Sequence, residues 1–175
     1  MRMLKVGGRL FLFTTANNFC GHGFYQFSPE LFFRLFSAGN GFRVEQVLLV
    51  EYRLGGGFSL TPACYSMIDP AVAGARSMVY TRSRVLCFVR AQKTASTAST
   101  SFSTPLQSDY VERWSAGDGS TRTRSRAQQA LRRMHEALPL NLRQLTLEYY
   151  QRNYALTFRN RRFYRRVAFL DFSAY

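Results

Sequence analysis

Cysteine and histidine are scarce in this sequence. Its three cysteines, Cys20, Cys64 and Cys87, are an odd number at wide spacing, which fits neither a disulfide framework nor a zinc site. We expect them to be buried free thiols in a reducing cytoplasm. The two histidines, His22 and His135, are far apart in sequence, so a dedicated metal centre has little support.

Long apolar runs are also missing. No stretch approaches the ~20 apolar residues that a membrane-spanning helix requires. Near the start, only Leu10 to Phe13 is continuously apolar, which is shorter than the ~7–15 apolar residues of a signal peptide. The sequence therefore predicts a cytoplasmic protein that does not bind a membrane.

Apolar residues and positive charge are abundant. With 46% hydrophobic and 15% aromatic residues, the 175-residue chain can form one core of ordinary domain size. The formal net charge is +14, which favours binding to polyanions. Lys and Arg outnumber Asp and Glu by 11 to 4 before residue 94 and by 13 to 6 after it, so both halves are basic. A local cluster contains Arg159, Arg161, Arg162, Arg165 and Arg166.

The composition changes near the middle of the chain. Residues 94–104 are small and mostly Ser or Thr, so they cannot offset their ordering entropy by burial, and we interpret them as a linker. This linker divides a compact α/β region, residues 1–93, from a basic and mainly helical tail, residues 105–175. A second stretch rich in Gly, Ser and Thr, residues 115–124, favours turns.

Within the first region, the pattern predicts three strands in one sheet, with the last two antiparallel. They are residues 9–15, 42–51 and 84–91, all rich in β-favouring apolar residues. Ser28 and Pro29 predict the start of an amphipathic helix on one face of the sheet, and Asn40-Gly41 its end. Further predictions are a loop at residues 55–57, a short helix from Asp69-Pro70 to near Tyr80, and tail helices over residues 126–138 and 142–169.

Four segments together resemble one enzyme family. They are LKVGGRLFL from Leu4 to Leu12, GHGFYQFSPELF from Gly21 to Phe32, GFRVE from Gly41 to Glu45, and the strand from Val85 to Lys93. In this order they resemble the C-terminal half of a class I S-adenosylmethionine-dependent methyltransferase. The resemblance implies an α/β fold with part of a Rossmann-like sheet, namely strands five to seven with the intervening helix.

The resemblance also implies a function. It implies methyl transfer from S-adenosylmethionine to a small-molecule or sugar-like acceptor. The tentative substrate-binding residues lie in the loop after the first strand, where open α/β sheets collect ligands. The unperturbed pKa of a histidine side chain lies near neutrality, so His22 could accept a proton. In the alternative interpretation, these side chains only attach the loop to neighbouring backbone. The candidate residues are Asn17, Asn18, His22, Tyr25 and Gln26.

The cofactor-binding half of the family pattern is absent. No Gly-rich turn follows a first strand, and no downstream acidic residue is placed to meet the ribose. We therefore expect this chain alone to bind no S-adenosylmethionine and to be inactive, as a truncated form. One alternative is a non-enzymatic basic module whose tail binds RNA or another acidic partner. For the tail itself we favour a different interpretation, in which its aromatic side docks on the domain or the tail is partly disordered. A third possibility for the whole chain is the remnant of a truncated gene.

Overall fold

The computed structural model describes residues 3–52, 62–96, 104–107 and 126–168. The first region contains β1 (Arg9–Asn17), α1 (Pro29–Leu35), the 3-10 turn η1 (Ala38–Asn40), β2 (Phe42–Tyr52), β3 (Ala63–Met67), α2 (Pro70–Ala73) and β4 (Arg84–Lys93). The tail contains α4 (Arg126–Glu136), α5 (Leu140–Tyr150), the π-helical segment η3 (Gln151–Ala155) and β5 (Tyr164–Val167).

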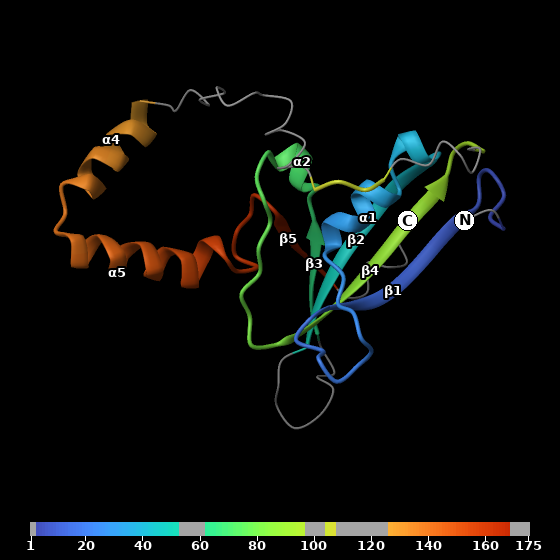
Figure 1. Ribbon diagram of the computed structural model, residues 1–175, viewed down its shortest axis with the longest axis horizontal. Helices are drawn as coiled ribbons and strands as arrows, with labels where there is room; N and C mark the ends of the chain where they lie inside the picture. Colours follow the sequence, from blue (N-terminus) through green and yellow to red (C-terminus); the bar gives the residue numbers. More distant parts are fainter. Residues whose placement is uncertain (1–2, 53–61, 97–103, 108–125, 169–175) are drawn as a thin grey trace.

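The strands form one sheet in the order β1-β4-β2-β3-β5 (Figure 1). Every pair of neighbours is antiparallel. β1 and β2 therefore run in the same direction, with β4 between them in the opposite direction. This confirms that the three predicted strands share a sheet and that the last two are antiparallel. The fold is mixed α/β, and the sequence analysis missed β3 and β5.

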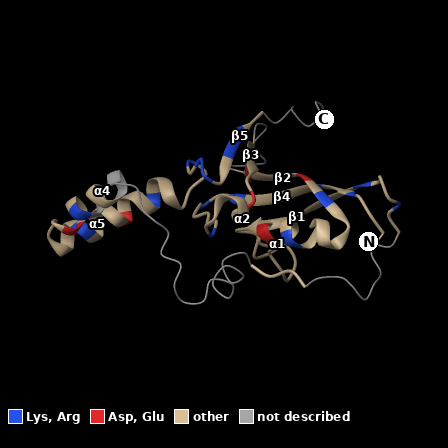
Figure 2. Ribbon diagram, turned by 90° about the horizontal axis from the view of Figure 1, so that it is seen from above, with Lys and Arg blue, Asp and Glu red and all other residues tan. Residues whose placement is uncertain are grey.

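Helix α1 covers one face of the sheet (Figure 2). Phe32 and Phe36 are four positions apart and both are buried in the main core. The helix is shorter than predicted, because it ends at Leu35 and a 3-10 turn follows. The Asn40 side chain donates to the Leu35 carbonyl at 3.0 Å, and Gly41 then turns the chain into β2 with a φ of 74°. The sheet residues of this core include Val47, Leu49, Met67, Val85, Cys87 and Val89.

Helix α2 is also shorter than predicted. Its first residue is Pro70, and the Asp69 carboxylate caps it by accepting a hydrogen bond from the Ala71 amide at 2.9 Å. Asp69 also pairs with Arg34 of α1. The helix ends at Gly74, whose left-handed φ of 60° stops it well before Tyr80.

The predicted helix over residues 142–169 is wrong in its second half. After α5 and η3 the chain turns at Asn160 and enters β5, which pairs with β3. Phe163 and Tyr164 are buried, whereas Arg161, Arg165 and Arg166 are exposed. Burial of two aromatic rings at the sheet edge therefore overrides the helical pattern, and the tail is only partly helical.

Several features complete the comparison with the sequence predictions. Cys64 and Cys87 are buried free thiols as expected, but Cys20 is exposed. The loop at 55–57, most of the 94–104 linker and the stretch 115–124 lie outside the described residues. Among the described residues, no helix is long and apolar enough to cross a membrane.

Candidate functional site at the end of strand β1

The end of β1 and the loop that follows it carry all five candidate residues, with Asn17 as the last residue of the strand. Asn18, at its start, has a left-handed φ of 59°, a conformation that asparagine tolerates better than most residues. Its side-chain Nδ2 donates to the carbonyls of Thr81 and Ser83, each at 2.7 Å. The side chain of Asn17 accepts a hydrogen bond from the Asn18 amide at 3.0 Å. Both asparagines therefore fix the path of the backbone.

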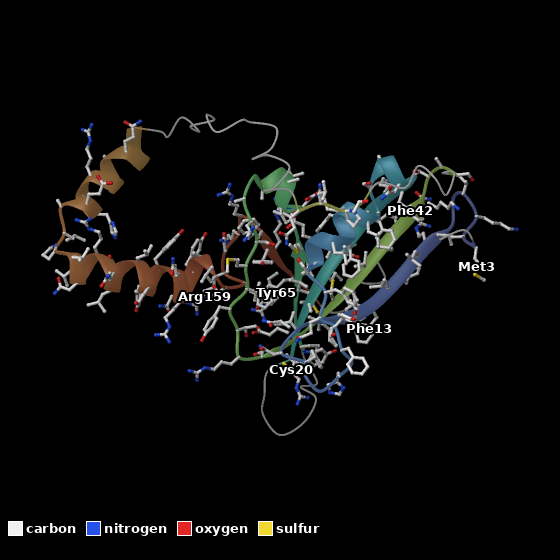
Figure 3. All side chains as sticks on the ribbon, in the orientation of Figure 1. Met3, Phe13, Cys20, Phe42, Tyr65 and Arg159 are labelled. Carbon is white, nitrogen blue, oxygen red and sulfur yellow. The ribbon has the colours of Figure 1, made fainter. Side chains whose placement is uncertain are left out.

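Phe19 anchors the middle of this loop. Its ring is buried with Val50, Cys64 and Leu86 on the face of the sheet opposite α1. Gln26 closes the loop, because its Oε1 accepts a hydrogen bond from the Phe19 amide at 3.0 Å. The Gln26 Nε2 also lies 3.8 Å from the Sγ of Cys20. Figure 3 shows Cys20 near the end of β1 that carries this loop.

His22 and Tyr25 have the more accessible side chains. The His22 ring contacts the Phe19 ring edge to face, with 5.4 Å between centroids, and the residue is exposed. Tyr25 is 75% exposed, although its main-chain carbonyl accepts a hydrogen bond from the Thr15 hydroxyl at 3.2 Å. Thus Asn17, Asn18 and Gln26 build the loop, while His22 and Tyr25 present polar groups to solvent.

A polar network beside the loop was missed by the sequence analysis. The Thr81 hydroxyl donates to Glu51 Oε1 at 2.7 Å and accepts a hydrogen bond from the Ser83 amide at 3.0 Å. Since Asn18 binds the carbonyls of Thr81 and Ser83, this network connects the loop to the end of β2. Glu51 is buried. The available sequence signal was an acidic residue directly after the apolar run that ends at Val50.

A separate hollow of about 300 Å³ lies on the sheet face opposite α1. The register places Phe11, Arg90 and Gln46 in one row across β1, β4 and β2, and Phe13, Phe88 and Leu48 in the next row. Phe11 and Phe13 are 72% and 59% exposed. The hollow is therefore mainly aromatic and apolar, with one guanidinium and one amide. None of the five candidate residues lines it.

Positive charge surrounds a single carboxylate at one end of this face. Glu45 lies 3.0 Å from the Nε of both Arg9 and Arg90 and 3.8 Å from Arg43. The hydrogen bond from Arg9 is the main reason that the pKa of Glu45 lies below its ordinary value, and the charges of the arginines lower it further. The pairing of Glu45 with Arg9 and Arg90 joins β1, β4 and β2 through their side chains.

Comparisons with known proteins do not identify the chain. No protein-family model matches it, and neither a curated protein nor a solved structure matches it. Among the described residues, no group of three or more His, Cys, Asp or Glu side chains could hold a metal ion.

Proposed function

We propose that the chain is the C-terminal part of a class I S-adenosylmethionine-dependent methyltransferase and is inactive by itself. The observation that carries this proposal is the arrangement of β1, α1, β2 and β4. β1 and β2 run in one direction and are connected through α1, and β4 runs antiparallel between them. This agrees with the fifth, sixth and antiparallel seventh strands that the four sequence segments resemble.

The residues of this chain do not fit the cofactor itself. The loop between β1 and α1 is closed by the hydrogen bonds of Asn18 and Gln26 rather than open as a glycine cradle. The hollow on the sheet is mainly apolar and offers only Gln46 and Arg90 as polar side chains. A nucleoside with ribose hydroxyls and a cationic sulfonium needs acidic and amide partners. A cofactor site must therefore come from other residues.

The loop after β1 supplies the acceptor side in this proposal. Its rigid backbone presents His22 and Tyr25, whose exposed side chains provide hydrogen-bonding groups for a small-molecule or sugar-like acceptor. In this proposal the His22 imidazole is the proton acceptor for an acceptor hydroxyl. Among the described residues, no hydrogen bond to its imidazole is present. A cytoplasmic location belongs to the same proposal.

The nucleotide sequence upstream of Met1 provides the most direct test. We expect it to encode, in frame, an apolar strand followed by a Gly-rich turn, within roughly the 100 residues that the missing strand–helix units require. The longer polypeptide should bind S-adenosylhomocysteine in calorimetry, and the 175-residue chain should not. Either saturable binding of S-adenosylmethionine to the 175-residue chain, or an upstream sequence without such a turn, would overturn the proposal.

A second candidate function is polyanion binding through the tail. Arg159, Arg161, Arg165 and Arg166 are exposed within eight positions of one another, and blue segments mark β5 and the turn before it in Figure 2. Arg162 differs, because its guanidinium donates to the carbonyls of Ala73 and Gly74. Arg162 is also exposed, but its guanidinium attaches the tail to the end of α2.

This difference between the arginines makes the second function testable. Binding of a fluorescent single-stranded RNA should weaken with salt, because each phosphate contact releases a counterion. Replacement of Arg159, Arg161 and Arg165 by Gln should reduce the log–log salt slope by about 2, at ~0.7 per contact. Arg162→Gln should instead lower thermal stability and leave the slope unchanged. Equal slopes for the triple variant and the parent chain would exclude the exposed cluster as the binding surface.

A further inference from the structure

We propose that two copies of this chain pair through their β1 edges, in an antiparallel register with Phe11 opposite Phe11 of the second copy. β1 is an outer strand of the sheet (Figure 1), and no described strand pairs with its outer side. An edge strand without protection offers a row of backbone donors and acceptors to another chain. This inference does not rest on the methyltransferase proposal.

The hydrogen bonds of the loop define which part of the edge is open. The Thr15 carbonyl accepts a hydrogen bond from the Phe27 amide at 3.0 Å, so the backbone groups of Thr15 point away from β4. The hydrogen-bonding direction of the backbone alternates along a strand. The N–H and C=O groups of Arg9, Phe11 and Phe13 therefore also point outward, while those of Gly8, Leu10 and Leu12 face β4. In agreement, the Gly8 carbonyl accepts from the Lys93 amide at 2.9 Å. The open edge therefore runs from Arg9 to Phe13.

This short edge is symmetric about its middle residue. If Phe11 faces Phe11 of a second copy, then Arg9 faces Phe13 of that copy, and all three outward residues of each strand can form hydrogen bonds. A register centred on Phe13 would direct the copy toward Thr15, whose carbonyl is already bonded to Phe27. The Phe27 segment thus selects the register centred on Phe11.

The side chains are complementary in the same register. The two exposed Phe11 rings become neighbours, and each Arg9 lies opposite an exposed Phe13 ring, a pairing of cation and aromatic face. Each Arg9 keeps its ion pair with Glu45. The two Arg9 residues are four positions apart, roughly 14 Å at 3.4 Å per residue, beyond the ~8 Å Debye length at physiological salt. Local charge therefore permits the contact, although each copy carries +14.

Sedimentation velocity tests the association. The mass should rise with concentration from 20.1 kDa toward about twice that value, and added salt should strengthen the dimer by screening the net charge. Phe11→Pro should abolish the dimer, because it removes an outward amide and leaves the ladder with β4 intact. Phe11→Leu is the matched control and should retain the dimer. A chain that stays monomeric at all concentrations and salt levels would overturn the proposal.

Cysteine cross-linking tests the register without relying on proline. In a Cys20→Ser background, Phe11→Cys should form an intermolecular disulfide under mild oxidation, since hydrogen-bonded antiparallel pairs have Cα atoms ~5.5 Å apart. Phe13→Cys should not, because the two substituted positions lie roughly 14 Å apart in this register. Equal cross-linking at both positions, or faster cross-linking at position 13, would contradict the register centred on Phe11. S-adenosylmethionine is absent from both assays, so their outcome is independent of the proposed enzyme function.

Discussion

The sheet body and the helical arm use similar side chains in opposite ways. In the body, which we define as β1 to β5 with α1 and α2, large apolar residues such as Phe36 and Val50 are fully buried. In the arm, which we define as α4 and α5, Leu140, Leu145 and Tyr149 are 68%, 61% and 72% exposed. Helix α5 buries no residue, and Figure 1 shows the arm extending away from the sheet.

Spacing explains this difference better than hydrophobic content does. Phe32 of α1 and Phe36, the residue directly after its end, are four positions apart, so they lie on the same side. At 100° per residue, the four leucines of α5 fall on two opposite sides of the helix, Leu140 and Leu147 on one side and Leu142 and Leu145 on the other. A helix without a single apolar stripe has no one surface to bury. Apolar composition alone therefore does not predict docking.

The largest effect should come from removing a buried aromatic side chain from the core of the body. Phe36→Ala removes a buried ring and should lower the free energy of unfolding by ~3–5 kcal/mol. The matched change in the arm, Leu145→Ala, should stay within ~0.5 kcal/mol, because that side chain is exposed. Urea unfolding followed by fluorescence measures both. A loss of several kcal/mol in Leu145→Ala would show that the arm is packed in solution.

Alkaline pH should weaken the body through its buried thiol. Burial raises the pKa of Cys87 from 9.0 to about 12. Because the folded-state pKa is raised, this stability is fully present below about pH 9 and is lost as pH rises toward 12. At about pH 10.5 the loss should be ~2 kcal/mol, at 1.36 kcal/mol per unit.

Two alanine variants isolate the contribution of Cys87. Burial also raises the pKa values of Cys64, Tyr52 and Tyr164, so the parent chain should lose stability at high pH for several reasons. Cys87→Ala should remove only the part of the pH dependence of stability that comes from ionisation of the Cys87 thiol. Thermal melts between about pH 8 and 10.5 measure this part. Cys20→Ala changes an exposed thiol and should leave the parent's pH dependence as it is. Identical pH profiles for all three chains would contradict the assignment to Cys87.

Three neighbouring strands of the sheet could be predicted from the sequence because their signals are local. Apolar β-favouring runs identified β1, β2 and β4, and the Ser28-Pro29 pair located the first residue of α1. The boundaries depended on interactions that the pattern does not contain. Asn40 bonding to Leu35 and the left-handed Gly74 both ended helices earlier than expected.

The missed strands show the limit of such patterns. β3 has five residues and β5 has four, so neither is long enough for a clear alternation. β5 also carries Arg165 and Arg166, which favoured a basic helix in the sequence analysis. Its pairing with β3 joins residues about 100 positions apart in the sequence, a contact that no local signal predicts.

The candidate site was predicted as a location rather than as a set of contacts. Asn17 ends β1, and Asn18, His22, Tyr25 and Gln26 lie in the loop after it. That Asn18 would bond to the carbonyls of Thr81 and Ser83 could not be predicted, because these residues follow more than 60 positions later. The contact between Glu51 and Thr81, which are 30 positions apart, also has no local signal in the sequence.

The smallest effect concerns the point where the tail meets the body. Phe158 stacks on Tyr65 of β3, with 4.2 Å between ring centroids and 4° between planes. Phe158→Leu keeps an apolar side chain but loses the stack, so the free energy of unfolding should fall by ~0.5–1.5 kcal/mol. Phe24→Leu, at a fully exposed ring in the loop after β1, is the control and should change little. Urea unfolding of the two variants and the parent resolves this difference when the midpoints are compared at equal slope.

If Phe158→Leu unfolds like the parent, the stack contributes nothing and β5 is held by Phe163, Tyr164 and its pairing with β3. If instead the free energy of unfolding falls as much as in Phe36→Ala, Phe158 is a full member of the core. The packed part of the chain would then begin before Phe163, closer to α5.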